Sequence, residues 1–184
     1  MKGIENNAQK QTHLDLLKDF WDKITQHDKE EDDDLLNRYL TEFNISLDSQ
    51  FIRQKPSISR LNIDMLECYK QVITYYLDNM CVVDEGKHSN EGIRLSFVLN
   101  ELYPEISSIN KKNIQTNITR KRDQNYKPRI FSPVFVGIIE RVDINSRRKM
   151  PGIYQITNRE NAETYIEFLE EIIRVNDVLS NKRY

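Results

Sequence analysis

Residues 130–157, IFSPVFVGIIERVDINSRRKMPGIYQIT, decide the fold that we expect for this chain. An apolar run ends at Gly137, the short segment GIIERV follows it, and the segment GIYQIT begins at Gly152. Alternating apolar and polar residues in both segments predict β-strands, and Pro151-Gly152 favours a turn between them. We therefore expect a β-hairpin whose tip carries three cations, Arg147, Arg148 and Lys149.

Helices are expected on both sides of this hairpin, because apolar residues recur there at spacings of three and four. They are predicted at residues 12–27, 35–43, 63–80, 93–103 and 111–124, and from about 158 to 179. Ser108 or Asn110 is expected to cap the helix at 111–124, and Thr157 with Glu160 has the spacing of a capping box. The predicted fold class is mainly α with a small antiparallel β-hairpin.

Composition indicates a soluble protein with one sizeable core or two small ones. The chain has 184 residues, of which 38% are apolar and 30% charged. No run of about 18 apolar residues predicts a membrane span, and the N-terminal residues have no apolar signal segment. Cys68 and Cys81 lack metal-ligand spacing, so we expect two reduced thiols and a cytoplasmic location.

The charge is distributed unevenly. The formal net charge is −2, yet residues 110–150 hold eleven basic residues against three acidic ones, and an acidic run spans Asp28 to Asp34. A localised basic segment favours a polyanionic partner such as a phosphate backbone. The alternative interpretation is that these charges only form a solvated surface.

The order of elements over residues 63–157 (helix, loop, helix, turn, basic helix, strand, basic turn, strand) resembles the winged helix-turn-helix superfamily. The resemblance implies a winged-helix core that binds double-stranded DNA, with one helix in the major groove and the wing against the backbone or minor groove. It divides the chain into an acidic helical hairpin (1–43), a connector that has room for a short strand (44–62), the core (63–157) and a C-terminal helix (158–184). The outer helices are candidates for homodimerisation or for binding a protein partner.

The resemblance implies that residues 111–124 form the recognition helix, with Ile114 and Ile118 turned inward. A second assignment stays open, in which residues 128–136 form that helix and Ser132-Pro133 caps it. The candidate DNA-binding residues are Lys111, Lys112, Gln115, Thr116, Thr119, Arg120, Arg122, Lys127, Arg129, Arg147, Arg148 and Lys149.

No motif in the sequence predicts catalysis or a cofactor. The three histidines stand far apart, and phosphate-binding glycine loops and nucleophile motifs are missing. Asp64, Glu67 and Lys70 share a helix face, where an i,i+3 ion-pair array is the simpler interpretation than a nuclease site.

The leading hypothesis is therefore a DNA-binding protein, either a transcriptional regulator or the recognition subunit of a larger DNA-processing or defence assembly. The alternatives are a winged-helix subunit for protein contact and, third, a small nuclease.

Overall fold

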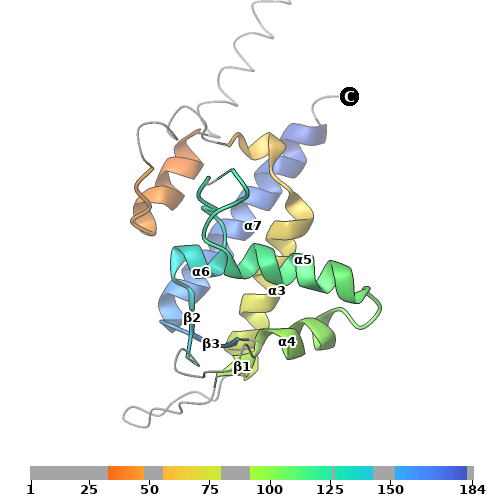
Figure 1. Cartoon of the computed structure of the whole chain (residues 1–184). Coiled ribbons are helices and arrows are strands. Elements are labelled where there is room, and N and C mark those ends of the chain that lie inside the picture. The colour runs from red at the N-terminus through yellow and green to blue at the C-terminus, as the bar shows by residue number, and fades with distance from the viewer. Residues whose placement is uncertain (1–32, 48–55, 80–91, 126, 143–151, 182–184) are drawn as a thin grey trace, which may run out of the picture.

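A computed structural model describes residues 33–47, 56–79, 92–125, 127–142 and 152–181 of the chain. This part is mainly helical, with a small three-stranded antiparallel sheet (Figure 1). The elements are a helix at 33–42, η1 (Ile58–Arg60), α3 (Ile63–Asn79), β1 (Ile93–Arg94), α4 (Leu95–Leu102), α5 (Ser108–Thr119), α6 (Pro133–Val136), β2 (Ile139–Arg141), β3 (Ile153–Ile156) and α7 (Arg159–Asn181). The helix expected at 12–27, the loop expected at 82–92 apart from Gly92, and the tip of the hairpin lie outside the described residues.

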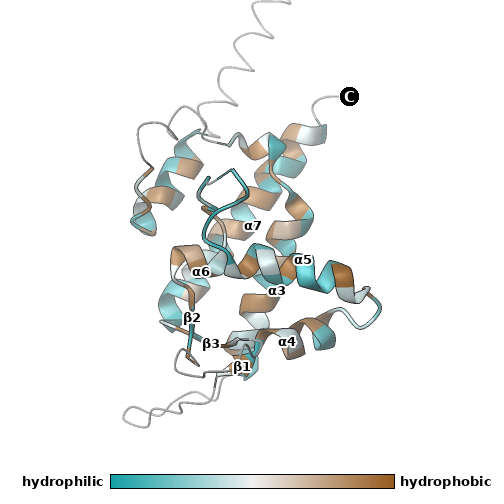
Figure 2. Cartoon of the chain, in the orientation of Figure 1, coloured by the Kyte–Doolittle hydropathy of each residue, from teal (hydrophilic) through white to brown (hydrophobic). Residues whose placement is uncertain are grey.

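The centre of the core is formed by α3 and α7, which lie side by side (Figure 1). Figure 2 shows the hydrophobic and hydrophilic bands that alternate along both helices, as the spacing of their apolar residues predicts. Val72 and Ile73 of α3 and Leu169 and Ile172 of α7 are completely buried. The helices predicted at 63–80 and 158–179 are confirmed over the described residues.

The helix at 33–42 adds aromatic rings to this core. Tyr39 is completely buried, and its ring centroid lies 4.9 Å from that of Phe131 and 5.7 Å from that of Phe168 on α7. The ring centroid of Phe43, just beyond the helix, lies 5.9 Å from that of Tyr165 on α7. Because such ring pairs contribute beyond the area they bury, the helix is fixed to the face of α7.

The sheet has the strand order β1-β3-β2. The predicted hairpin is confirmed by the pairing of β2 with β3, in which Glu140 lies opposite Gln155. The third strand, β1, pairs Ile93 with Tyr154. The prediction of a helix over 93–103 was therefore wrong at its start: Arg94 has an extended backbone, and the helix begins at Leu95.

Two interactions explain why the chain is extended at β1. A Cβ at Gly92 would lie 2.5 Å from the carbonyl oxygen of Tyr154, so only glycine allows the two strands to approach this closely. The Tyr76 hydroxyl of α3 donates a hydrogen bond of 2.9 Å to the carbonyl of Ile93. The strand is thus fixed by partners that are distant in sequence.

Two predicted helix boundaries also differ from the structure. The helix expected at 111–124 spans Ser108–Thr119 and is capped by Ser107, whose side chain accepts a hydrogen bond from the Asn110 amide. The capping box at Thr157 does not form. Asn158 caps α7 through the Asn161 amide at 2.9 Å, and the Thr157 hydroxyl donates instead to the carbonyl of Gly137.

Candidate nucleic-acid interface

The strongest concentration of positive charge in the described chain lies on α5 and on the loop that follows it. Residues 108–129 hold seven basic residues and one acidic residue. We call residues 120–129 the basic loop; α5 and this loop lie at the front of the molecule in Figure 1, where α5 crosses α3. These elements form the candidate interface.

The burial of α5 defines which of its faces is available to a ligand. Ile114 and Ile118 are buried, as predicted, and the Tyr69 hydroxyl of α3 donates to the carbonyl of Asn117 at 3.3 Å. With 3.6 residues per turn, the opposite side of the helix carries a distinct set of residues. We call it the outward face of α5, and its members are Ile109, Lys112, Asn113 and Thr116.

The predicted residues of α5 do not all lie on this face. Lys112 is exposed, whereas Lys111 is half-buried and donates through Nζ to Asn100 of α4 at 3.0 Å. Gln115 is half-buried. The hydroxyls of Thr116 and Thr119, also half-buried, donate to carbonyls one turn earlier, at 2.8 and 2.9 Å. Lys112 is therefore the best placed cation of the helix itself.

The helix ends at Thr119 because the basic loop has its own hydrogen bonds. The Asp123 carboxylate accepts from the amides of Asn125 and Lys127 at 2.8 and 2.9 Å, and the Asp123 amide donates to the Lys127 carbonyl. Such side chain to backbone bonds compete with helix formation. Arg120 and Arg122, predicted as helical, therefore lie in the loop, where they are exposed together with Lys121 and Lys127.

The end of the basic loop is attached to the core by two buried tyrosines. Tyr39 donates to the carbonyl of Ile130 at 2.9 Å, and Tyr165 donates to the carbonyl of Phe131 at 2.5 Å. Burial raises the pKa of both hydroxyls well above the ordinary tyrosine value, so both remain protonated donors. These two hydrogen bonds fix the backbone directly after the basic loop to the core.

Arg129 has a different environment from the other cations of the loop. Its side chain is half-buried, and it donates to Asn117 Oδ1 on α5 and to the Arg122 carbonyl. It also lies beside Tyr69; burial raises the pKa of this tyrosine to about 12, although the guanidinium lowers it. Arg129 therefore braces the loop against α5, in addition to contributing its charge.

Short helix α6 bears on the second assignment of the recognition helix. Only Pro133–Val136 of the segment 128–136 is helical, and the predicted cap by Ser132-Pro133 is confirmed. The helix ends after one turn because Gly137 adopts a left-handed conformation, with φ of 83°. Pro133 is buried, and the helix has only four residues, so it offers less surface than α5.

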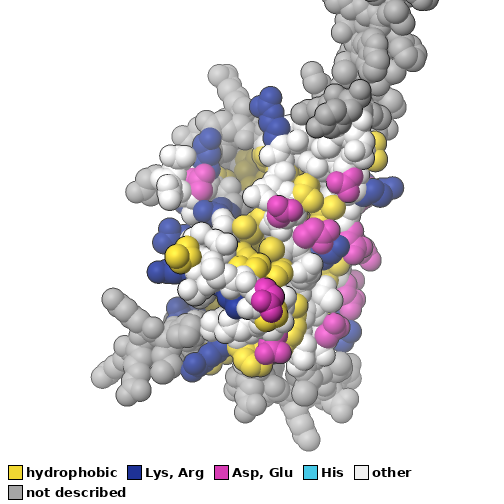
Figure 3. All heavy atoms as spheres, turned by 90° about the vertical axis from the view of Figure 1, so that its right-hand side faces the viewer, with side chains coloured by type: hydrophobic (Ala, Val, Ile, Leu, Met, Phe, Trp, Pro, Cys, Tyr) yellow, Lys and Arg dark blue, Asp and Glu magenta, His cyan; other side chains and the backbone are white. Residues whose placement is uncertain are grey.

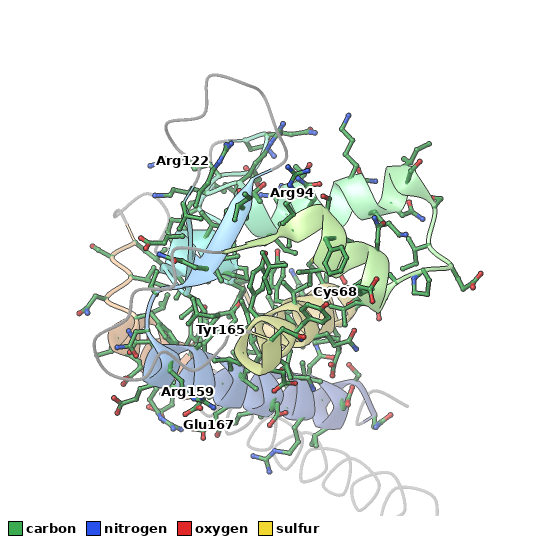
Figure 4. All side chains as sticks on the ribbon, turned by 90° about the horizontal axis from the view of Figure 1, so that it is seen from below. Cys68, Arg94, Arg122, Arg159, Tyr165 and Glu167 are labelled. Atoms are coloured by element: carbon green, nitrogen blue, oxygen red, sulfur yellow. The ribbon has the colours of Figure 1, made fainter. Side chains whose placement is uncertain are left out.

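The sheet contributes cations at its two outer strands. Arg94 of β1 and Arg141 of β2 are exposed. Figure 4 shows Arg94 and Arg122 on one side of the molecule, whereas Glu167 and Arg159 of α7 lie on the opposite side. The three predicted cations of the hairpin tip, Arg147, Arg148 and Lys149, lie outside the described residues.

The opposite side of the molecule is acidic. Helix α7 carries six acidic residues and two basic ones, and its apolar side packs against α3 and η1 within the chain. In Figure 3, many Lys and Arg side chains gather along the left edge, which corresponds to the front of Figure 1, while Asp and Glu side chains lie toward the right. A polyanion would therefore be attracted to the α5 side and repelled by the α7 side.

Two of the three residues that could form a nuclease site, Glu67 and Lys70, form an ion pair with each other. Lys70 Nζ lies 3.0 Å from Glu67 and 3.7 Å from Glu170 of α7. Within the described residues, no group of three or more histidine, cysteine, aspartate or glutamate side chains is arranged to hold a metal ion. None of the described helices is both long and apolar enough to cross a membrane.

Comparison with known proteins gives no further guide to the site. Neither a protein-family model, nor a curated protein, nor a solved structure matches this chain significantly.

Sequence reasoning missed five residues of this surface, Ile109, Asn113, Lys121, Arg94 and Arg141. Ile109 lay outside the predicted helix because that helix was started at Lys111, and Arg94 was placed inside a helix. The pair Ser107-Ser108 was the available signal for the true start of α5, since serine is a preferred N-cap.

Proposed function

We propose that this chain is a winged-helix protein that binds double-stranded DNA through the outward face of α5, the basic loop and the hairpin. The observation that carries the proposal is the joining of exposed cations on α5 and the basic loop into one basic side, opposite an acidic helix. Arginine and lysine on such a surface neutralise phosphates and release counterions.

The connectivity of the sheet supports the same proposal. The order α3, β1, α4, α5, α6, β2, β3 contains the element order of the resemblance, with β1 and the one-turn helix α6 added. Because β1 leads directly into α4 and pairs with β3, the hairpin and the two helices α4 and α5 belong to one unit. In such a unit a DNA duplex would meet the hairpin and α5 in a fixed relative orientation.

The charge of the surface sets the expected strength of the salt effect. Lys112, Arg120, Lys121, Arg122 and Lys127 are exposed. If each neutralises one phosphate, the logarithm of the association constant falls with the logarithm of the salt concentration at a slope of about −4.5. Raising the salt from 50 to 200 mM would then weaken binding about 500-fold.

The test is a titration of a labelled duplex with the intact protein at several salt concentrations. In the variant K112A/K121A/K127A the slope should become flatter by up to about 2.7. The control variant R60A/R159A/R174A removes the same charge from η1 and α7 and should leave the slope near that of the natural protein. Equal slopes for the two variants, or no binding at low salt, would refute the proposal.

A second candidate, a winged-helix subunit for protein contact, draws support from two exposed apolar side chains outside the basic surface. Phe97 of α4 is 52% exposed and Val178 of α7 is 50% exposed. Single exposed apolar residues are common on protein surfaces, so this observation weighs less than the basic side.

The remaining candidate roles are separated by simple readouts. In the DNA titration a protein-contact subunit shows no salt-dependent affinity, and a nuclease cleaves the duplex when divalent metal is added. Sedimentation of the free protein tests the proposed homodimer, and the regulator and recognition-subunit roles differ in whether the chain binds DNA without partners.

A further inference from the structure

The outward face of α5 has one apolar member among polar ones. Ile109, in the first turn of the helix, is 72% exposed, more than either other large exposed hydrophobic residue of the described chain. Asn113 stands four residues later on the same face and is exposed as well. An isoleucine in water gives up the free energy that burial would provide, so a ligand with an apolar group can gain from covering it.

The position of this pair matches the part of a recognition helix that reaches base edges. In helix-turn-helix proteins the N-terminal residues of the recognition helix contact the bases, while flanking cations hold the backbone. Ile109 and Asn113 lie in the first half of α5, and the exposed cations Lys112, Arg120 and Lys121 lie beside them and toward the other end.

The major groove offers chemical partners to both side chains. Its characteristic apolar group is the 5-methyl of thymine, and asparagine forms a pair of hydrogen bonds with N6 and N7 of adenine. Four helical residues span about 6 Å along the axis. Successive base pairs are about 3.4 Å apart, so the two side chains fit bases about two steps apart.

We propose that Ile109 and Asn113 determine the sequence preference of this protein, Ile109 by covering a thymine methyl and Asn113 by pairing with an adenine about two base pairs away. This inference rests on the proposed DNA-binding function and adds to it a substrate class, duplexes with two A·T pairs about two steps apart in the site. Thymine replaced by uracil keeps its base pairing and loses only the methyl group, which isolates the contact made by Ile109.

The experiment begins with selection of preferred duplexes from a randomised pool by the intact protein. Each thymine of the preferred duplex is then replaced by uracil, one position at a time, and affinities are measured for the natural protein and for Ile109→Ala. The natural protein should lose about fourfold in affinity at one position, as expected for one methyl group. The Ile109→Ala protein should bind the thymine and uracil duplexes equally.

Matched variants separate reading of the base from general damage. Phe97→Ala, which truncates an exposed residue of α4, should keep the fourfold difference between thymine and uracil. Asn113→Ala should remove the preference for adenine at the position about two base pairs away. Replacing that adenine by 7-deazaadenine should weaken DNA binding by the natural protein but not by this variant. Since Ile109 and Asn113 are both exposed, neither substitution is expected to unfold the protein.

Each result either supports or overturns the inference. If the protein binds DNA but no uracil substitution changes its affinity, or if Ile109→Ala still distinguishes thymine from uracil, the inference is wrong and DNA binding stands. If selection from the pool yields no preferred sequence, the inference is likewise wrong and DNA binding stands. If no duplex is bound at low salt, both the inference and the proposed function fail.

Discussion

Replacing Ser132 tests how the basic loop is held, because this buried serine connects α5 with α6. Its hydroxyl donates to the carbonyl of Ile118 at 2.6 Å and accepts from the amide of Phe135 as the N-cap of α6. Ser132 and Ile118 are both completely buried, so water cannot replace the missing hydroxyl without rearrangement. The last carbonyls of α5 depend on such partners outside the helix.

The expected cost of Ser132→Ala has two parts. Loss of an N-cap costs about 1 kcal/mol, and a buried carbonyl left without a partner costs about 1–3 kcal/mol. We expect the free energy of unfolding to fall by about 2–4 kcal/mol, which corresponds to a decrease of about 4–16 °C in melting temperature for a chain of this size. The decrease also measures how firmly the basic loop is attached.

Ser107→Ala provides the matched control for this experiment. Ser107 also caps a helix, but it is exposed, and its side chain accepts a hydrogen bond of 3.4 Å from the Asn110 amide. Its replacement should cost about 1 kcal/mol or less. Urea denaturation of the two variants and the natural protein, with unchanged m-values, gives the comparison. If Ser132→Ala is no more destabilising than Ser107→Ala, the argument from burial is wrong.

Two buried tyrosines, Tyr165 and Tyr69, and the hairpin tip provide further tests. Tyr165→Phe removes the buried donor to the Phe131 carbonyl and should lower the free energy of unfolding by about 1–3 kcal/mol in a urea titration; a change below about 0.5 kcal/mol would contradict that role. Burial raises the folded-state pKa of Tyr69 to about 12, above its ordinary value of 10. The stability that the protonated Tyr69 hydroxyl contributes to the fold is therefore fully present below pH 10 and is lost as the pH rises toward 12. Between pH 10 and about 12 the free energy of unfolding, measured by urea titration at each pH, should fall more for the natural protein than for the Tyr69→Phe variant. Equal decreases would show that the pKa of Tyr69 is not raised by folding. In a variant with alanine at Arg147, Arg148 and Lys149, the salt dependence of DNA binding should flatten by up to about 0.9 for each phosphate that the tip neutralises, and an unchanged slope would exclude the tip from the interface.

The parts of the fold that the sequence predicts well are those whose signal is local. The helices α3 and α7 and the pairing of β2 with β3 follow from the period of their apolar residues. Strand β1 has only two residues, and its extended backbone depends on Tyr154 and Tyr76, which are far away in the sequence. No local pattern contains that information, so the segment was predicted as the first turn of a helix.

In the candidate site, too, the features with a local signal in the sequence were predicted and those that depend on distant contacts were not. The basic segment and the inward orientation of Ile114 and Ile118 follow from the sequence, because charge and helical period are local properties. The end of α5 at Thr119 and the bracing role of Arg129 depend on contacts in the folded chain, among them those of Asp123 and Asn117. For that reason the sequence placed Arg120, Lys121 and Arg122 on a helix, whereas the structure places them on an anchored loop.

The proposed DNA-binding surface consists of the outward face of α5 and the basic loop. The most direct measurement is amide hydrogen exchange of the intact protein with and without a saturating duplex at low salt. We predict slower exchange in residues 108–129 on DNA binding and little change along α7. Protection along α7, or a bound duplex that leaves residues 108–129 unchanged, would contradict this prediction.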